Sequence, residues 1–128
     1  MATTKYILRQ GESKVLEIPV LDENGQAVDI STSATTNIIV TLSNKGVVFS
    51  KYSLQDMGSD FGDIDRTGNT IQILAERNET KFWNTGYALA TVTIENDDPA
   101  LTHAVKDFEV PDFIQILTST NKDIVLPH

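Results

Sequence analysis

The 128-residue sequence has no cysteine, only two histidines and one tryptophan, and no long apolar run. The lack of cysteine excludes disulfide bonds and thiolate metal sites, and it fits synthesis and assembly in a reducing cytosol. No segment approaches the ~18 apolar residues that a membrane-spanning helix needs, so we expect a soluble protein without a membrane partner. The length is that of one domain, which can bury a hydrophobic core without stabilisation by disulfide bonds.

Positive charge is also scarce, because 10 Lys and Arg residues stand against 18 Asp and Glu residues and give a net charge of -8. A surface of this sign repels phosphate backbones, so we expect no nucleic-acid partner. The acidity favours solubility and carries no information about the fold.

Catalytic signatures are missing as well. Because His128 is the last residue, a base for nucleophilic catalysis would have to be His103, beside a polar turn. The chain has no G-x-S-x-G or H-E-x-x-H motif and no glycine-rich phosphate loop. We therefore predict no enzyme, no catalytic or metal residue and no cofactor, and a hydrolase dependent on His103 is the weakest alternative.

An acidic loop at residues 56–69 is the one candidate for metal binding. It carries Asp56, Asp60, Asp63 and Asp65, and calcium prefers oxygen ligands in such loops. The EF-hand spacing is absent, and aspartate and glycine are ordinary turn residues, so we predict a solvated loop. The alternative is a calcium- or carbohydrate-binding β-sandwich that recognises a cell surface through these acids and Trp83.

What the sequence does have is apolar residues that alternate with polar ones in short runs between turn residues, a pattern typical of antiparallel sheets. In three of the runs the predicted core faces consist of Leu16, Ile18 and Val20, of Ile38, Val40 and Leu42, and of Ala88, Ala90, Val92 and Ile94. The pattern predicts an all-β sandwich of about seven or eight strands. The expected strands lie at residues 14–20, 28–30, 37–43, 47–54, 68–74, 86–95, 103–110 and 113–117.

Local signals refine this plan. Pro19 cannot donate to a strand ladder, so its strand should lie at an edge or meet a bulge. Residues 44–46 should turn a hairpin. Residues 75–83 favour a short helical connector, with Phe82 and Trp83 closing the end of the core. The polar loops at 31–37 and 56–69 are the expected mobile segments, and Pro111 should separate the last two strands.

The ends of the chain carry the candidate contacts with other proteins. We predict a sandwich domain at 1–118 and an extended C-terminal tail at 119–128. Apolar triplets near termini have little reason to face water, and an edge strand can accept a partner. The candidate interface residues are Tyr6, Ile7, Leu8, Pro19, Ile124, Val125 and Leu126. The alternative is that both triplets complete the domain's own sheets.

Three motifs follow one another from residue 6 to about 117. They are a turn and strand that lead to a second acidic turn, a short helix with a threonine before a glycine and tyrosine, and the closing stretch 108–116. The first two motifs contain Gly11, Glu12, Ser13, Asp22, Gly25, Val28, Asp29 and Ile30, and then Thr80, Gly86 and Tyr87. This order resembles the immunoglobulin-like domains at the N-terminus of phage upper baseplate proteins and related virion proteins.

The resemblance implies an immunoglobulin-like β-sandwich that acts as a docking module in a bacteriophage virion. It implies binding to other virion proteins as a capsid auxiliary or head-fibre protein or as a tail or baseplate adaptor, in a homo-oligomer or lattice. Such a protein would be made and assembled in the host bacterial cytoplasm. The chain departs from the family pattern because Tyr87 follows Gly86 directly, and because it ends where relatives often continue into a coiled coil or receptor-binding region.

Overall fold

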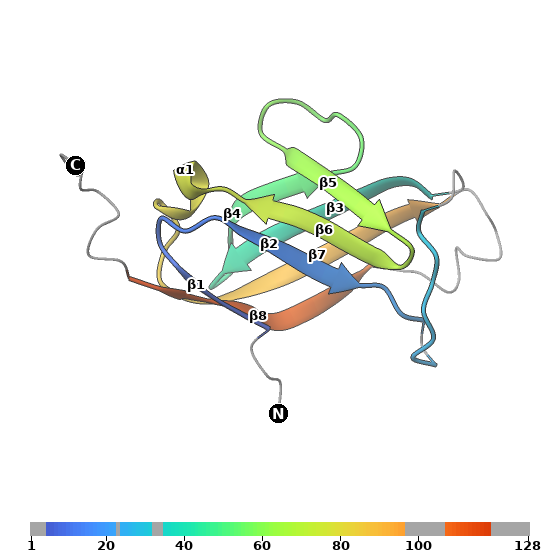
Figure 1. Ribbon diagram of the computed structural model, residues 1–128, viewed down its shortest axis with the longest axis horizontal. Coiled ribbons are helices and arrows are strands. Elements are labelled where there is room, and N and C mark those ends of the chain that lie inside the picture. Colours follow the sequence, from blue (N-terminus) through green and yellow to red (C-terminus); the bar gives the residue numbers. More distant parts are fainter. Residues whose placement is uncertain (1–4, 23, 32–34, 97–106, 119–128) are drawn as a thin grey trace.

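The computed structural model describes residues 5–22, 24–31, 35–96 and 107–118 (Figure 1). These ranges contain eight strands and one short helix. The elements are β1 (Tyr6–Arg9), β2 (Lys14–Pro19), β3 (Thr35–Asn44), β4 (Val47–Ser53), β5 (Gly62–Thr67), β6 (Thr70–Ala75), α1 (Arg77–Thr80), β7 (Gly86–Asn96) and β8 (Phe108–Leu117).

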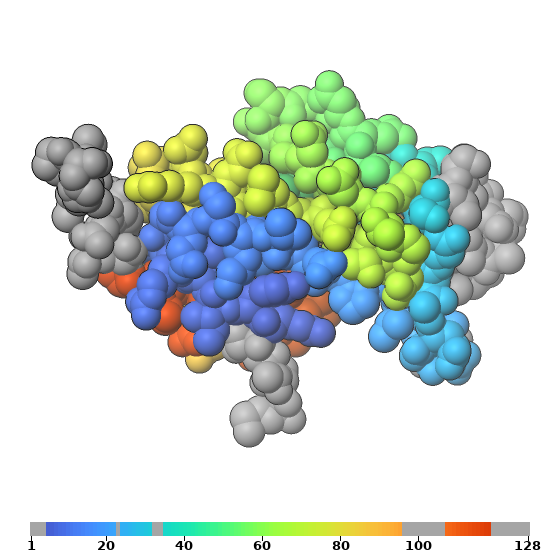
Figure 2. All heavy atoms as spheres, in the orientation of Figure 1, coloured from blue at the N-terminus to red at the C-terminus, as the bar shows by residue number. Residues whose placement is uncertain are grey.

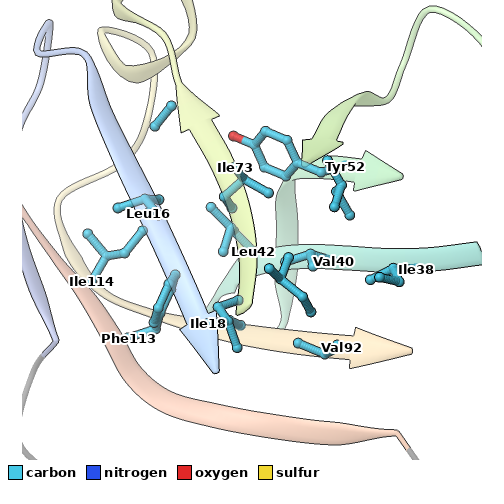
Figure 3. Close-up of a cluster of buried hydrophobic side chains, with 14 of the residues drawn as sticks. Leu16, Ile18, Ile38, Val40, Leu42, Tyr52, Ile73, Val92, Phe113 and Ile114 are labelled. Carbon is cyan, nitrogen blue, oxygen red and sulfur yellow. The ribbon is translucent and has the colours of Figure 1, made fainter. Parts of the chain in front are cut away.

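The strands are hydrogen-bonded in the order β1-β8-β7-β3-β4-β5-β6-β2. The contact between β4 and β5 is short, since only Tyr52 with Gly62 and Ser53 with Asp63 are paired. The sheet folds over at this contact into a five-stranded layer, β1-β8-β7-β3-β4, and a three-stranded layer, β5-β6-β2. Figure 3 shows Leu16 and Ile18 of β2 directed toward the five-stranded layer, so the core lies between the two layers.

The arrangement of strands is that of an immunoglobulin domain. The order β2-β6-β5 in one layer and β3-β7-β8 in the other corresponds to strands B-E-D and C-F-G of that fold, with β4 added beside β3. The predicted all-β, immunoglobulin-like sandwich is therefore confirmed. Two of the pairings, β1 with β8 and β4 with β5, are parallel, whereas the sequence pattern predicted antiparallel strands throughout.

The period-two pattern predicted the core well. All the alternate apolar residues assigned to the core in β2, β3 and β7, and Val20 just after β2, are buried. The predicted hairpin joins β3 to β4 through Lys45 and Gly46, both with positive φ (52° and 81°), as a two-residue turn of type I′ requires.

Two segments differ from the prediction. The expected mobile loop at 56–69 contains β5, whose sequence GDIDRT has only one apolar residue, Ile64, to show the alternation. Of the predicted helical connector at 75–83, only α1 is helical. After it, Trp83 is 3% exposed and packs edge-on against Phe49 with ring centroids 4.9 Å apart, whereas Phe82 is 74% exposed. Only Trp83 closes the core.

Pro111 does not separate two strands, because β8 runs through it. Between Ala88 and Ala90 of β7 the partners on β8 move from Ile114 to Val110, so the β8 strand bulges there. Asp112 lies in this bulge with φ 51°. A bulge removes residues from the ladder, which is how a strand tolerates a residue without an N–H. The start of the predicted strand 103–110 lies outside the described residues, as do residues 32–34 of the other predicted loop, whose last residues belong to β3.

The two ends of the strand order, β1 and β2, are edge strands, as Pro19 predicted for β2. Side chains cover part of both edges. The Tyr6 hydroxyl accepts a hydrogen bond from the Glu17 N–H of β2 at 2.8 Å. In return, the Lys14 ammonium donates to the Ile7 carbonyl of β1 at 2.9 Å.

Gly62 allows the close contact between β4 and β5. A Cβ atom at this position would lie 2.8 Å from Cδ1 and 3.0 Å from Cε1 of Tyr52, a ring that is buried in the core. We expect Gly62→Ala to lower the free energy of unfolding by about 1–3 kcal/mol through overpacking, measured by urea denaturation. The same substitution in a Tyr52→Leu background should cost much less, and an equal cost in both backgrounds would contradict the steric explanation.

Candidate functional site

The predicted interface residues have different positions in the structure. Leu8 is fully buried, and the half-buried Tyr6 ring packs edge-on against Phe113 with centroids 5.4 Å apart. These two residues therefore help to complete the domain itself, the alternative stated above. Ile7 is 54% exposed, and Pro19 is exposed at the edge of β2. The remaining three candidates, Ile124, Val125 and Leu126, lie outside the described residues.

The motif residues between β1 and β2 bind the short helix. The Gly11 N–H donates to Thr80 Oγ1 at 3.1 Å, and Thr80 Oγ1 donates to the Glu12 carbonyl at 2.7 Å. The Arg77 N–H at the start of α1 donates to Ser13 Oγ at 3.0 Å. Gly11 has φ 90°, a conformation that glycine adopts without steric cost. The turn and Thr80 therefore have an intramolecular role in fixing α1 against the domain.

The acidic residues of the alternative hypothesis do not form a metal centre with an aromatic platform. Trp83 is buried in the core and cannot stack on a surface ligand. Asp63 and Asp65 are exposed on β5, and Asp60 is exposed in the turn before it. Within the described ranges, no three acidic or histidine side chains are placed to hold a metal ion together. His103 lies outside these ranges.

The outward face of the five-stranded layer carries a different candidate surface. On its two neighbouring central strands, β3 and β7, seven successive outward positions are uncharged. We call these residues the uncharged strip: Ile39, Thr41, Ser43, Tyr87, Leu89, Thr91 and Thr93. The register pairs Ser43 with Leu89, Thr41 with Thr91 and Ile39 with Thr93, so the strip is continuous across the two strands.

Aromatic and aliphatic groups are accessible on and beside the strip. Tyr87 is 52% exposed, and the other six members are partly exposed. Val48 of β4 pairs with Ser43 and is about half exposed, and Ile7 of β1 stands beside Gln115 of β8 at the other side. Exposed apolar and aromatic groups without charges are the composition found at the centre of protein interfaces.

Charged residues of both signs lie around the strip. Arg9 and Lys51 lie on the flanking strands β1 and β4, and Glu95 and Glu109 lie on β7 and β8. The strip itself carries no charge, so it does not by itself repel a partner of either sign. The residues of the strip are visible in the sequence as uncharged Ile, Thr, Ser, Leu and Tyr residues at alternate positions. That they form one continuous surface follows only from the strand order.

Comparison with known proteins gives no family. No protein-family model matches the chain, and no curated protein matches it. Among solved structures, the chain is similar to the extracellular domain of mouse leukocyte-associated immunoglobulin-like receptor 1, in a strand-swapped dimer. The identity is 10%, the match covers 98% of this chain and 90% of that one, and the TM-score is 0.37. A likeness this remote carries no argument, and the immunoglobulin-like assignment follows from the strand order.

Across the parts of the chain that the structure describes, no helix has the length and apolar character to cross a bilayer.

Proposed function

We propose that the chain is a non-enzymatic docking module of a bacteriophage particle, which binds another virion protein through the uncharged strip. The assignment to a phage particle rests on the resemblance of the sequence motifs to phage virion domains. The observation that carries the docking surface is the continuous uncharged strip on β3 and β7 in a protein with a net charge of -8.

The physical basis is desolvation. Burying the strip against a partner removes apolar side chains and hydroxyls from water but removes no charge. Most of an acidic surface is costly to bury, because its carboxylates would lose water without gaining a partner. Tyr87 is the expected anchor, because tyrosine is enriched among residues that carry most of the binding energy of an interface. The partner is a different virion subunit, and a second copy of this chain is the competing occupant.

The place of the protein in the particle can be tested by quantitative mass spectrometry of purified phage, with heads separated from tails. We expect the chain in one of the two fractions, at a fixed ratio to the other structural proteins. Its absence from both fractions would exclude the proposal. Light scattering of the isolated protein tests the competing occupant, since a dimer that dissociates on Tyr87→Glu would assign the strip to a second copy.

The strip itself is tested by charge insertion. We expect Tyr87→Glu to reduce incorporation into particles by roughly tenfold or more, because it removes an anchor and buries a charge. The melting temperature should change little, since Tyr87 is half exposed. Thr67→Glu is the matched control, because it adds the same charge at an exposed position of β5 in the other layer. Equal incorporation of the two variants would contradict docking through the strip.

A further inference from the structure

A short turn after β2 is held by its own hydrogen bonds. The Gly25 N–H donates to the Asp22 carbonyl at 3.0 Å, and the Asp22 N–H donates to the Gln26 carbonyl at 2.8 Å. We call Asp22, Asn24, Gly25 and Gln26 the Asp22 turn. In Figure 2 the light-blue atoms of this part of the chain project at the lower right of the molecule. The turn is therefore a surface feature that solvent reaches.

The Asp22 turn contains the chain's single Asn-Gly pair, Asn24 and Gly25. In such a pair the backbone nitrogen of glycine can attack the asparagine side chain, because glycine has no Cβ to hinder the approach. Every other asparagine of the chain precedes a residue with a side chain. Both residues of the pair are exposed, and a Cβ atom placed on Gly25 would meet no atom within 4 Å. The surroundings therefore leave room for the reaction and for water.

The reaction of this pair is an internal substitution that needs no reagent except water. The Gly25 nitrogen forms a bond to Asn24 Cγ, the Cγ–Nδ2 bond breaks, and ammonia leaves with the proton of the Gly25 N–H. The product is a cyclic imide. Water then opens the ring at Cγ, which gives aspartate, or at the main-chain carbonyl, which gives isoaspartate with the backbone running through Cγ.

The native turn opposes the first step of this reaction. The N–H whose proton must leave donates to the Asp22 carbonyl, so this hydrogen bond has to break before the nitrogen can react. Asp22 Oδ1 also accepts the N–H groups of Asn24 and Gln26, each at 2.9 Å, which fixes the backbone on either side of Gly25. The negative charge of this carboxylate further disfavours an anionic nitrogen beside it.

We infer that Asn24 is a site of spontaneous deamidation and that the Asp22 turn sets its rate. The reaction proceeds from the open turn and is held back while the turn is closed. Local opening is an equilibrium, and the hydrogen bonds of the turn determine how often it occurs. The site lies outside the uncharged strip and is independent of the proposed docking function.

The two products alter the molecule differently. Each of them adds a carboxylate beside Asp22 to a chain whose net charge is already -8. Isoaspartate also adds a backbone atom within the turn, next to the antiparallel bridge between Leu21 and Ala27. This bridge cannot keep its register across a longer backbone, so the isoaspartate form should melt at a lower temperature than the aspartate form.

The site is tested by incubating the full chain in neutral buffer and following each asparagine by peptide mapping with mass spectrometry. We expect Asn24 to deamidate first and to give both aspartate and isoaspartate. Asn24→Gln should remove these products, because glutamine would have to form a larger ring. Faster deamidation of another asparagine in both the folded and the urea-unfolded chain would overturn the inference.

The role of the turn is tested by Asp22→Ala. In the folded state this variant should lose the Asn24 amide about fivefold faster, because each lost hydrogen bond favours the open turn. In urea the variant and the parent chain should react at one rate, which exceeds that of the folded parent chain by about tenfold or more. A folded parent chain that reacts as fast as the unfolded one would overturn the inference.

Asp56→Ala is the matched control. It removes the same charge and the same kind of contact, since Asp56 Oδ1 accepts the Gly58 N–H at 3.0 Å in another exposed loop. This variant should leave the Asn24 rate within about twofold of that of the parent chain. Equal acceleration by the two variants would overturn the role of the turn, because only net charge would then matter.

Hydrogen exchange of the Gly25 amide reports the opening of the turn without the chemistry. Asp22→Ala should speed this exchange by a factor similar to that for deamidation. Faster exchange without faster deamidation would show that opening does not control the reaction, and would overturn the inference.

Discussion

Phe113→Ala is expected to lower the free energy of unfolding by about 3–5 kcal/mol, a large part of the stability of a domain of this size. Phe113 is fully buried, and its ring supports Tyr6, whose hydroxyl binds the backbone of β2. The substitution therefore leaves a cavity and loosens the contact between β1 and β2. Urea denaturation followed by tryptophan fluorescence measures the loss, since Trp83 is buried in the same core.

Phe82→Ala is the matched control for this experiment. The same change of side chain at a position that is 74% exposed should alter stability by no more than about 0.5 kcal/mol. If Phe113→Ala does not fold, Phe113→Leu keeps most of the volume and should cost about 1 kcal/mol. Similar costs at positions 113 and 82 would show that the packing around Phe113 is wrong.

Thr80→Val is expected to destabilise the domain by about 2–3 kcal/mol, although the two side chains have nearly the same shape. The hydroxyl of Thr80, which is fully buried, accepts from the Gly11 N–H and donates to the Glu12 carbonyl. Valine leaves both backbone groups without this partner, and an unsatisfied buried group costs more than the net gain from its hydrogen bond.

Two further variants make the test of Thr80 specific. Thr80→Ser keeps the hydroxyl and should recover most of the lost stability. Thr67→Val removes an exposed hydroxyl and should have an effect near zero. Faster hydrogen exchange of the Gly11 amide in Thr80→Val would locate the defect at the turn. A Thr80→Val variant as stable as Thr67→Val would contradict the assigned role.

The sequence predicted those parts of the fold in which one strand carries its own signal. Ile38, Val40 and Leu42 recur at every second position, so their burial follows from the period of a strand. Ile64 stands alone in β5, and nothing in GDIDRT distinguishes a strand from an acidic loop. Residues 62–67 form a strand because they pair with β6 and, over a short contact, with β4. Such pairing depends on the assembled sheet and cannot be seen in the segment alone.

The candidate sites were less predictable for the same reason. Asp63 and Asp65 are candidate calcium ligands by residue type, whereas the other polar groups that line the same pocket, among them Glu76, Glu79 and Tyr52, come from other elements. No spacing along the chain connects these residues. Trp83 was assigned both to the core and, in the alternative hypothesis, to a surface platform, and only its packing against Phe49 decides between them.

The covered edge of β2 has a consequence for self-association at high protein concentration. Backbone N–H groups alternate in direction along a strand, so Val15, Glu17 and Pro19 share the direction away from β6. At Glu17 this donor is taken by the Tyr6 hydroxyl, and proline has none. A strand from another molecule would therefore find only one of three outward N–H donors of β2 free. Edge-to-edge association into fibres through β2 is disfavoured as a result.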